Sequence, residues 1–416
     1  MDVYISSKGS QKGPYSLEQI RQMQERHEIL PIDYAWYAGL PAWVPIAQLQ
    51  PDGSIGPPPL HQKASFSHGA GAAFDRVTGR ITSIAGVEKV EGLHRKEFFS
   101  EVFKKRTEDE IEELFTTGTK STTPPLDTID TGWPHPWLFF KAFVAALLLF
   151  GGFYYGVAHF GNVNCIPGLI LVGSFGIPLA TLIFFVEMNV ARNMSLYQVF
   201  KLVNAGGLGA IIITLFLGTM FKAHTIWGWA LCTGFMEEAA KLLTVIILMR
   251  NKRFAWSLNG LLMGAAVGAG FAAFESAGYA LQFLFKDFVN SVQGQETNLM
   301  LQVMVMRALL APAGHVVWTA LAAAALWKVK SDQPFRWGML TDARFFRVFL
   351  LVVACHAIWD LNLFNNVAIA YTKYLLLGFV AWVAVLAYIQ DGLKQIRQAQ
   401  QASGAAPGTP AQAAAT

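Results

Sequence analysis

The chain has 416 residues, of which 53% are hydrophobic and 14% charged, and its mean hydropathy is +0.37. This composition is typical of a polytopic membrane protein that carries a soluble part. The net charge of +4 is spread over short segments, which argues against nucleic-acid binding, and three scattered cysteines are too few for a disulfide framework. Residues 1–4 lack the basic and apolar regions of a signal peptide, so we expect the N-terminal part to stay in the cytosol.

Residues 1–52 predict a small α+β domain. The stretch Val3–Ile5 alternates as a strand does, and apolar residues recur at helical spacing after Ser16, a good N-cap residue. A second strand is expected over residues 34–37, before a turn that ends at Trp43.

The motifs Gly13-Pro14-Tyr15 and Trp36…Gly39-Leu40-Pro41-Ala42-Trp43 resemble those of bacterial GYF-like domains. The resemblance implies an aromatic groove, formed by Tyr15, Trp36 and Trp43, for a proline-rich or other peptide. In the alternative interpretation, these rings only fill the core of a very small domain.

Two segments connect this domain to the membrane part. Residues 53–93 are rich in Gly, Ala and Ser and predict a flexible linker. Residues 94–136 predict an amphipathic helical spacer, with a capping box that opens at Thr107.

Residues 137–391 then predict a domain of about eight transmembrane helices. The apolar segments cover about 138–159, 166–187, 203–221, 225–249, 258–285, 300–327, 347–365 and 367–390. Alternate loops differ in their content of Lys and Arg, so the positive-inside rule places both termini in the cytoplasm. Residues 392–416 lack core-forming side chains and predict a disordered tail.

Ionisable side chains lie at similar depth inside four of these apolar segments. They are Glu237, Glu238, Glu275, His315 and His356. A charged group in the hydrocarbon core costs roughly 2.5 kcal/mol or more, so residues of this type on separate helices predict one shared functional site. Lys241 follows Glu237 by four residues and can hold that carboxylate, which leaves Glu238 free to face a cavity. Asp360 follows His356 by four residues and can fix the imidazole tautomer or join it at a metal.

Four ordered motifs of this region resemble those of PrsW-type intramembrane proteases, which are similar to CAAX prenyl proteases and bacteriocin-processing membrane proteins. The motifs are Glu237-Glu238-Ala239-Ala240-Lys241, Phe271-Ala272-Ala273-Phe274-Glu275, the His315 segment and His356-Ala357-Ile358-Trp359-Asp360. The resemblance implies that Glu237, Glu238, His315 and His356 are catalytic and that Lys241, Glu275 and Asp360 support them. Zn²⁺ on Glu238, His315 and His356 and a metal-free, glutamate-activated water both remain open.

The sequence therefore predicts an all-α polytopic protein of the bacterial inner membrane that acts as an intramembrane endopeptidase. The resemblance implies a membrane-anchored substrate, either an anti-sigma-factor-like protein or another single-span protein, and membrane lipid as the surroundings of the site. Two alternatives remain: a proton-coupled transporter, which would also place titratable groups in the membrane, and a non-proteolytic scaffold that displays the N-terminal module.

Overall fold

The computed structural model describes residues 2–7, 10–25, 29, 33–38, 40, 43–46, 49, 68–93, 95–107, 110, 115–221, 225–250, 254–295, 297–361 and 367–404. The chain divides into two units, residues 1–74 and 75–416, and each is described by itself. The first part of the expected linker, residues 53–67, and the end of the expected tail, residues 405–416, lie outside the described residues.

The first unit is the expected small α+β domain. Its strands β1 (Val3–Ser7), β2 (Ser10–Tyr15), β3 (Tyr34–Tyr37) and β4 (Val44–Pro45) form an antiparallel sheet in the order β2-β1-β3-β4. Helix α1 (Leu17–Glu25) begins behind Ser16, whose hydroxyl accepts the backbone N–H of Gln19 at 3.2 Å while the Gln19 side chain accepts the backbone N–H of Ser16. This reciprocal pair confirms Ser16 as the N-cap residue.

Helices make up the second unit. Helix α2 (His68–Ile84) begins in the first unit and ends in the second, and α3 (Arg95–Phe98) and the 3-10 turn η2 (Leu126–Thr128) follow it before the membrane part. The membrane part contains α5 (Leu138–Phe160), η3 (Val163–Cys165), α6 (Ile166–Leu171), η4 (Val172–Gly176), α7 (Ile177–Met188), α8 (Leu196–Lys201), η5 (Leu202–Gly206), α9 (Gly207–Met220), α10 (Ile226–Met249), α11 (Ser257–Val292), α12 (Leu299–Leu310), η6 (Ala311–Ala313), α13 (His315–Lys330), η7 (Trp337–Thr341), α14 (Ala343–Asp360) and α15 (Val367–Ala402).

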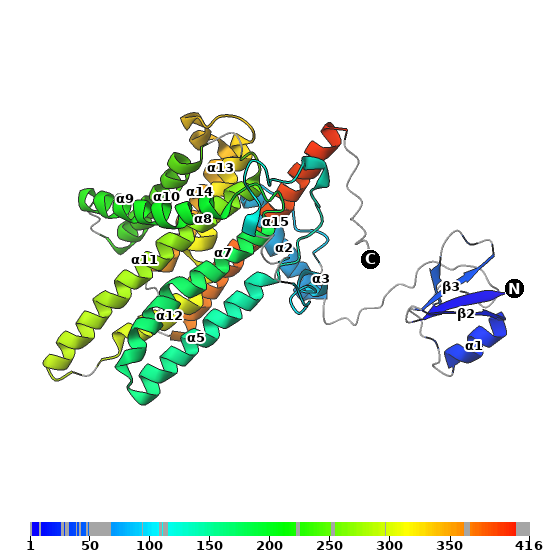
Figure 1. Ribbon diagram of the computed structural model, residues 1–416, viewed down its shortest axis with the longest axis horizontal. Coiled ribbons are helices and arrows are strands. Elements are labelled where there is room, and N and C mark those ends of the chain that lie inside the picture. The colour runs from blue at the N-terminus through cyan, green and yellow to red at the C-terminus, as the bar shows by residue number, and fades with distance from the viewer. Residues whose placement is uncertain are drawn as a thin grey trace. The chain divides into compact units, whose positions relative to one another are not determined.

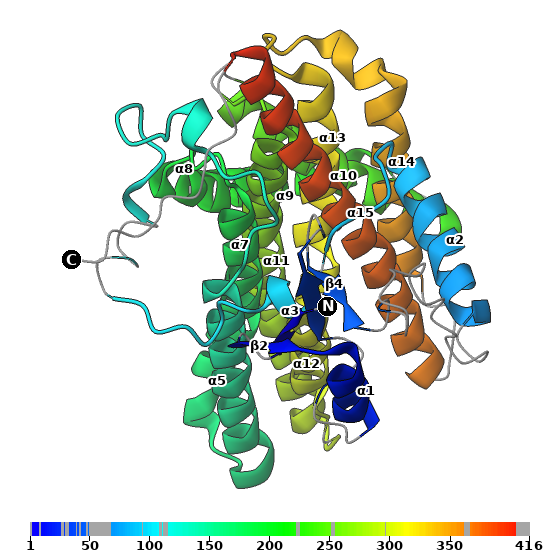
Figure 2. The same cartoon turned by 90° about the vertical axis from the view of Figure 1, so that its right-hand side faces the viewer.

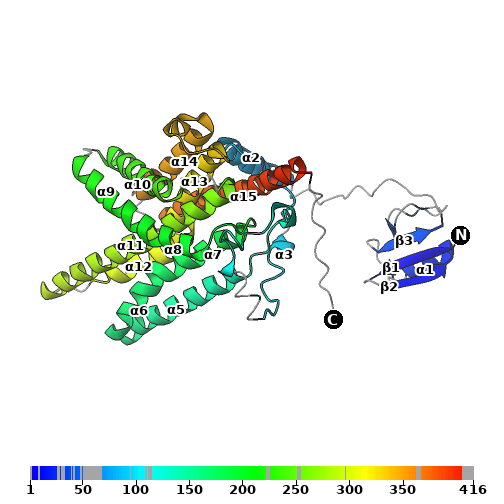
Figure 3. The same ribbon diagram turned by 45° about the horizontal axis from the view of Figure 1, so that its top comes forward.

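Helix α11 is the centre of this unit (Figure 1). It contacts α7, α9, α10, α12, α13 and α15, and every residue from 257 to 273 is buried. Figure 3 shows the C-terminal half of α11 running beside α12. Its tightest neighbour is α13, because Gly260, Gly264 and Gly268 face the backbone of that helix so closely that a methyl group at any of them would overlap it. Small residues allow two membrane helices to pack at this distance, as the glycine spacing predicts.

The expected apolar segment 300–327 is broken in its middle. Helix α12 ends at Leu310, a 3-10 turn follows, and α13 begins at His315. Pro312 causes the break, since proline has no N–H for the helical ladder and its ring clashes with the preceding turn. The Trp382 indole donates to the Pro312 carbonyl at 2.9 Å, which satisfies a backbone group freed by the break.

Six helical segments of the described chain are long and apolar enough to cross a membrane, compared with about eight expected. The segments are 138–160, 163–188, 196–220, 257–292, 299–330 and 370–402. The remaining two expected spans correspond to α10 and α14, and both contain three charged residues. The protein is therefore a polytopic, mainly helical membrane protein, and the two helices that fall short carry charged residues of the predicted site.

Three predicted boundaries differ from the structure. The expected flexible linker contains α2, and Ile81, Ala85 and Val87 from this region belong to the core of the second unit. Beyond α2, the chain crosses α15 (Figure 2), where the Gln390 side chain donates to the Lys89 carbonyl at 2.8 Å. In the expected spacer, the first helix is the four-residue α3. The predicted capping box is present, because Thr107 and Glu110 exchange side-chain to backbone hydrogen bonds at 2.9 and 3.3 Å. Helix α15 continues to Ala402, so the first part of the expected disordered tail is helical.

Candidate active site

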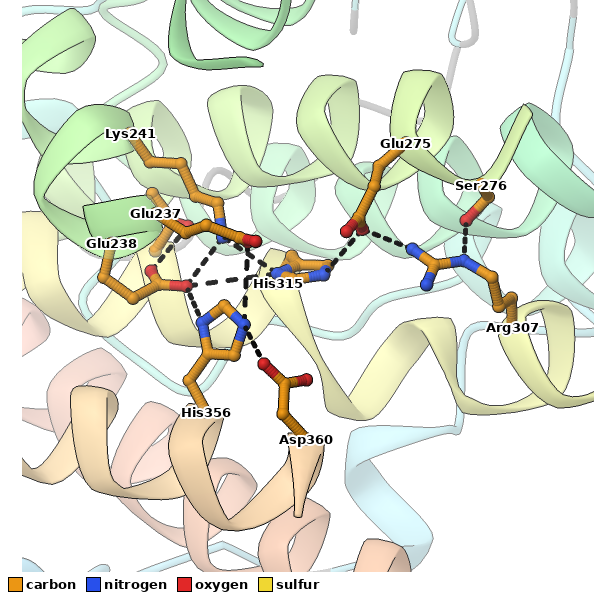
Figure 4. A network of polar contacts seen from close by, with 10 residues as sticks. Glu237, Glu238, Lys241, Glu275, Ser276, Arg307, His315, His356 and Asp360 are labelled. Carbon is orange, nitrogen blue, oxygen red and sulfur yellow. Dashed lines mark hydrogen bonds and ion pairs between the residues drawn. The ribbon is translucent and has the colours of Figure 1, made fainter. Parts of the chain in front are cut away.

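Four helices bring the predicted site residues together (Figure 4). Glu237, Glu238 and Lys241 lie in the middle of α10, and Glu275 lies on α11. His315 is the first residue of α13, whereas His356 and Asp360 belong to the last turns of α14. The four motifs therefore converge on one buried polar cluster.

Glu238 is fully buried and surrounded by donors. Its Oε1 lies 2.7 Å from Nζ of Lys241 and 2.9 Å from Nδ1 of His356, and its Oε2 accepts the hydroxyl of Thr319 at 3.3 Å. A buried carboxylate needs such donors, because its desolvation is otherwise uncompensated. The prediction that Glu238 is free to face a cavity is wrong: the packing of α10 against α13 and α14 turns this side chain inward.

Lys241 interacts with both glutamates and with one histidine. Its Nζ is 3.4 Å from Oε2 of Glu237 and 2.7 Å from Oε1 of Glu238, so the closer partner is the residue three positions away rather than four. The same Nζ lies 2.8 Å from Nδ1 of His315. Because an ammonium group only donates, this contact gives Nδ1 of a neutral His315 ring the role of acceptor.

His315 has a carboxylate partner on its other side. Its Nε2 lies 3.0 Å from Oε2 of Glu275, and Glu275 is also bound by Arg307. With Nδ1 accepting from Lys241, the ring proton belongs on Nε2 and is donated to Glu275. Glu275 therefore orients His315.

His356 is held in the same manner by a different carboxylate. Nδ1 donates to Glu238, which leaves the lone pair of a neutral ring on Nε2. That nitrogen lies 3.6 Å from Oε2 of Glu237 and 3.6 Å from Oδ2 of Asp360. Asp360 is thus a neighbour of His356, as the spacing predicts, but Glu238 makes the shorter contact with the ring.

These residues fit a divalent metal by the type of their donors. Glu237, His315 and His356 each offer a ligand atom within 4.8 Å of the other two. One carboxylate and two imidazoles form a known ligand set of catalytic zinc sites. Each histidine also binds a separate carboxylate through its other nitrogen, which is the usual arrangement behind a metal ligand. In the structure, the carboxylate that lies with the two histidines as a possible metal ligand is Glu237, whereas the sequence predicted Glu238 for this role. Lys241 already contacts Nδ1 of His315, so the ammonium and a metal ion would compete for that nitrogen.

A small cavity of about 40 Å³ adjoins His315. Ser276, Arg307, Trp318 and Trp359 are among the residues that line it. Because one water molecule needs at least roughly 10 Å³ of such space, the cavity has room for water beside the site.

Sequence reasoning missed several contributors to this cluster. Thr319 and Trp318 follow His315 by four and three residues, so helical spacing alone placed them on its side of α13. The Trp318 ring lies 4.8 Å from the ring of His356 and 5.4 Å from that of His315. Lys373 donates to the carbonyls of Trp359 and Leu361 at 2.8 and 2.7 Å, at the end of α14.

In the first unit, only part of the predicted aromatic set lies together. The rings of Trp36 and Trp43 are 6.4 Å apart, and Tyr4 joins Trp36 at 6.2 Å. Trp43 is 37% exposed, so one end of this aromatic group is open to a ligand. Tyr15 instead packs against the buried core that contains Val3.

Comparison with known proteins assigns both parts of the chain. Residues 195–389 match the PrsW family of intramembrane metalloproteases, and residues 4–50 match GYF domain 2. The first match contains all four helices of the site. None of the curated proteins or solved structures compared with the chain matches it. The chain therefore carries a PrsW family intramembrane metalloprotease domain, which is a hydrolase domain, together with an N-terminal GYF domain.

Proposed function

We propose that the protein is an endopeptidase that hydrolyses a peptide bond of a membrane-anchored, single-span protein. The observation that carries this proposal is the buried group of Glu237, His315 and His356, with donor atoms within 4.8 Å of one another. The separate carboxylates behind the two histidines support it further, since they fix both rings toward a common centre.

The contacts support a division of roles among the carboxylates. Glu238 is saturated by Lys241, His356 and Thr319, so its role is to orient His356. Glu237 and Asp360 both face Nε2 of His356, and Asp360, which is not a proposed ligand, can accept a proton from the attacking water. A divalent metal on Glu237, His315 and His356 would polarise the scissile carbonyl. Zn²⁺ is the metal we propose, because the donors are imidazole and carboxylate.

The distribution of basic residues supports a location and an orientation. With both termini in the cytoplasm of a bacterium and the helices in the inner membrane, Glu275 and Asp360 lie toward the outer half of the bilayer. We propose cleavage on that side of a protein such as an anti-sigma factor. The GYF domain would recruit a proline-rich or similar peptide in the cytosol, using the exposed end of the Trp36–Trp43 pair.

The proposal is tested by comparing membrane-protein N-termini from cells that express the wild type, Glu237→Gln or His356→Ala at equal levels. New N-termini that depend on the wild type and vanish in both variants would identify the substrate and support proteolysis. The matched control is Asp391→Asn, which removes a carboxylate that pairs with Lys328 at the other end of α13. Identical N-termini in all four strains under several envelope stresses would contradict the proposal.

A further inference from the structure

Arg307 of α12 binds the polar cluster at Glu275, on the side away from Glu238. Its Nε donates to the hydroxyl of Ser276 at 2.8 Å, and its Nη2 donates to Glu275. The guanidinium carbon also lies 4.6 Å from the centre of the Tyr279 ring. All three partners belong to α11, so the cation is fixed at one place on that helix (Figure 4).

Glu275 connects Arg307 to His315 on a third helix, α13. The oxygen that binds Arg307, Oε2, also contacts Nε2 of His315 at 3.0 Å. One carboxylate therefore joins a cation on α12 to an imidazole on α13. The arginine and imidazole side chains are only 18% and 13% exposed, so solvent does little to replace these contacts.

The local backbone makes side-chain support important at this position. His315 is the first residue of α13 and follows the break at Pro312. Its backbone N–H belongs to the first turn, where the helical ladder supplies no partner. The ring orientation thus depends more on Glu275 than it would in the middle of a helix.

We propose that Arg307 is a positioning residue for the active site: it fixes Glu275, which together with Lys241 keeps the proton of His315 on Nε2 and directs the Nδ1 lone pair toward the centre of the cluster. Lys241 alone does not secure this tautomer, because its Nζ has the carboxylates of Glu237 and Glu238 as further partners. This inference rests on the proposed function, because it assigns the lone pair to metal binding. Arg307 lines the cavity beside His315 but reaches that ring only through Glu275. Ser276 sets the angle of the guanidinium, and a lysine at position 307 would keep the charge without this second bond.

The first test reads the tautomer of His315 in the metal-free, full-length protein. Histidine is labelled with ¹⁵N, and the His315 signals are assigned by their loss in His315→Gln. The wild type should show Nε2 protonated and Nδ1 unprotonated. Arg307→Met should give a mixture of the two tautomers, and Arg307→Lys should restore most of the wild-type form.

The second test measures Zn²⁺ affinity by competition with a chromophoric chelator. Loss of an outer-shell partner typically weakens metal binding about 10–100-fold, and we expect this loss in Arg307→Met. The control is Lys330→Met, which removes a buried cation whose hydrogen bonds go to the carbonyls of Phe254 and Ser331 at the far end of α13, and it should change neither readout.

A wild-type tautomer in Arg307→Met, or an equal effect of Lys330→Met, would overturn the inference. If the wild type took up no Zn²⁺ while Arg307→Met still lost the tautomer, the positioning role would stand and the proposed metal chemistry would fail. The two ideas can therefore fail separately.

Discussion

A single methyl group on α11 should displace the helix that carries His315. The substitution Gly264→Ala would place a Cβ 2.7 Å from Cα of Ala320 and against the Thr319 carbonyl on α13. Carbon atoms pack at about 3.5–4.0 Å, so the two helices must separate by about 1 Å. Thr319 contacts Glu238, and His315 begins the same helix, so both sides of the site would move.

A displacement of about 1 Å can reduce a catalysed rate on the order of 100-fold. We expect this loss for Gly264→Ala, with a decrease in the free energy of unfolding of about 1–3 kcal/mol from overpacking. The assay follows the rate at which the enzyme-dependent N-terminus forms, alongside thermal unfolding of the purified protein.

The matched control is Gly278→Ala on the same helix, where no atom lies within 4 Å of the added Cβ. It should cleave at the wild-type rate and gain stability, because alanine favours a helix by about 1 kcal/mol over glycine. Wild-type cleavage by Gly264→Ala would show that the α11–α13 spacing does not position the site.

Three further substitutions test structural contacts. Glu187→Gln should lower the free energy of unfolding by about 1–3 kcal/mol, because the carboxylate accepts three backbone N–H groups at the start of α5; thermal unfolding measures this loss, and an unchanged stability would contradict it. Asp342 has a pKa lowered to about 2 by its side-chain and backbone hydrogen bonds with Arg344. Ionised Asp342 therefore adds to the free energy of unfolding above its unfolded pKa of about 4, and this addition is lost as the pH falls toward 2. Unfolding measured from pH 5 to 2 should show this part of the pH dependence in the wild type and not in Asp342→Asn. Lys373→Met removes the donor to the last carbonyls of α14 and should slow cleavage roughly tenfold by loosening the end of that helix; equal rates would assign Lys373 no role at the site.

The sequence was sufficient to predict that α10, α11, α13 and α14 share a site. Ionisable groups in apolar helices are costly, so their presence on four segments indicates convergence without any knowledge of the packing. The pairing of Lys241 with a nearby glutamate and of Asp360 with His356 followed from helical spacing.

The sequence could not decide which glutamate faces inward. Glu237 and Glu238 are adjacent and point about 100° apart, so their environments depend on where α13 and α14 pack. Similarly, the closeness of Arg307 to Glu275 depends on the alignment of α12 with α11, which local sequence does not encode. Pro312 did signal the break before His315, but the long apolar run around it favoured one continuous helix.

Helix α2 illustrates another limit. Its Gly- and Ala-rich sequence is typical of a linker when read alone. It becomes helical against the membrane unit, where the Tyr388 hydroxyl donates to the Ala85 carbonyl at 2.9 Å and Lys328 donates to the Gly86 carbonyl at 3.1 Å. Tertiary contacts of this kind override local preference.

The decisive measurement is cleavage of the identified substrate by the purified full-length protein in proteoliposomes, before and after metal removal. Cleavage should stop when a chelator removes the metal, return on addition of Zn²⁺, and be absent in His356→Ala under all conditions. Undiminished cleavage by protein shown to be free of metal, or by His356→Ala, would contradict a Glu237–His315–His356 metal site.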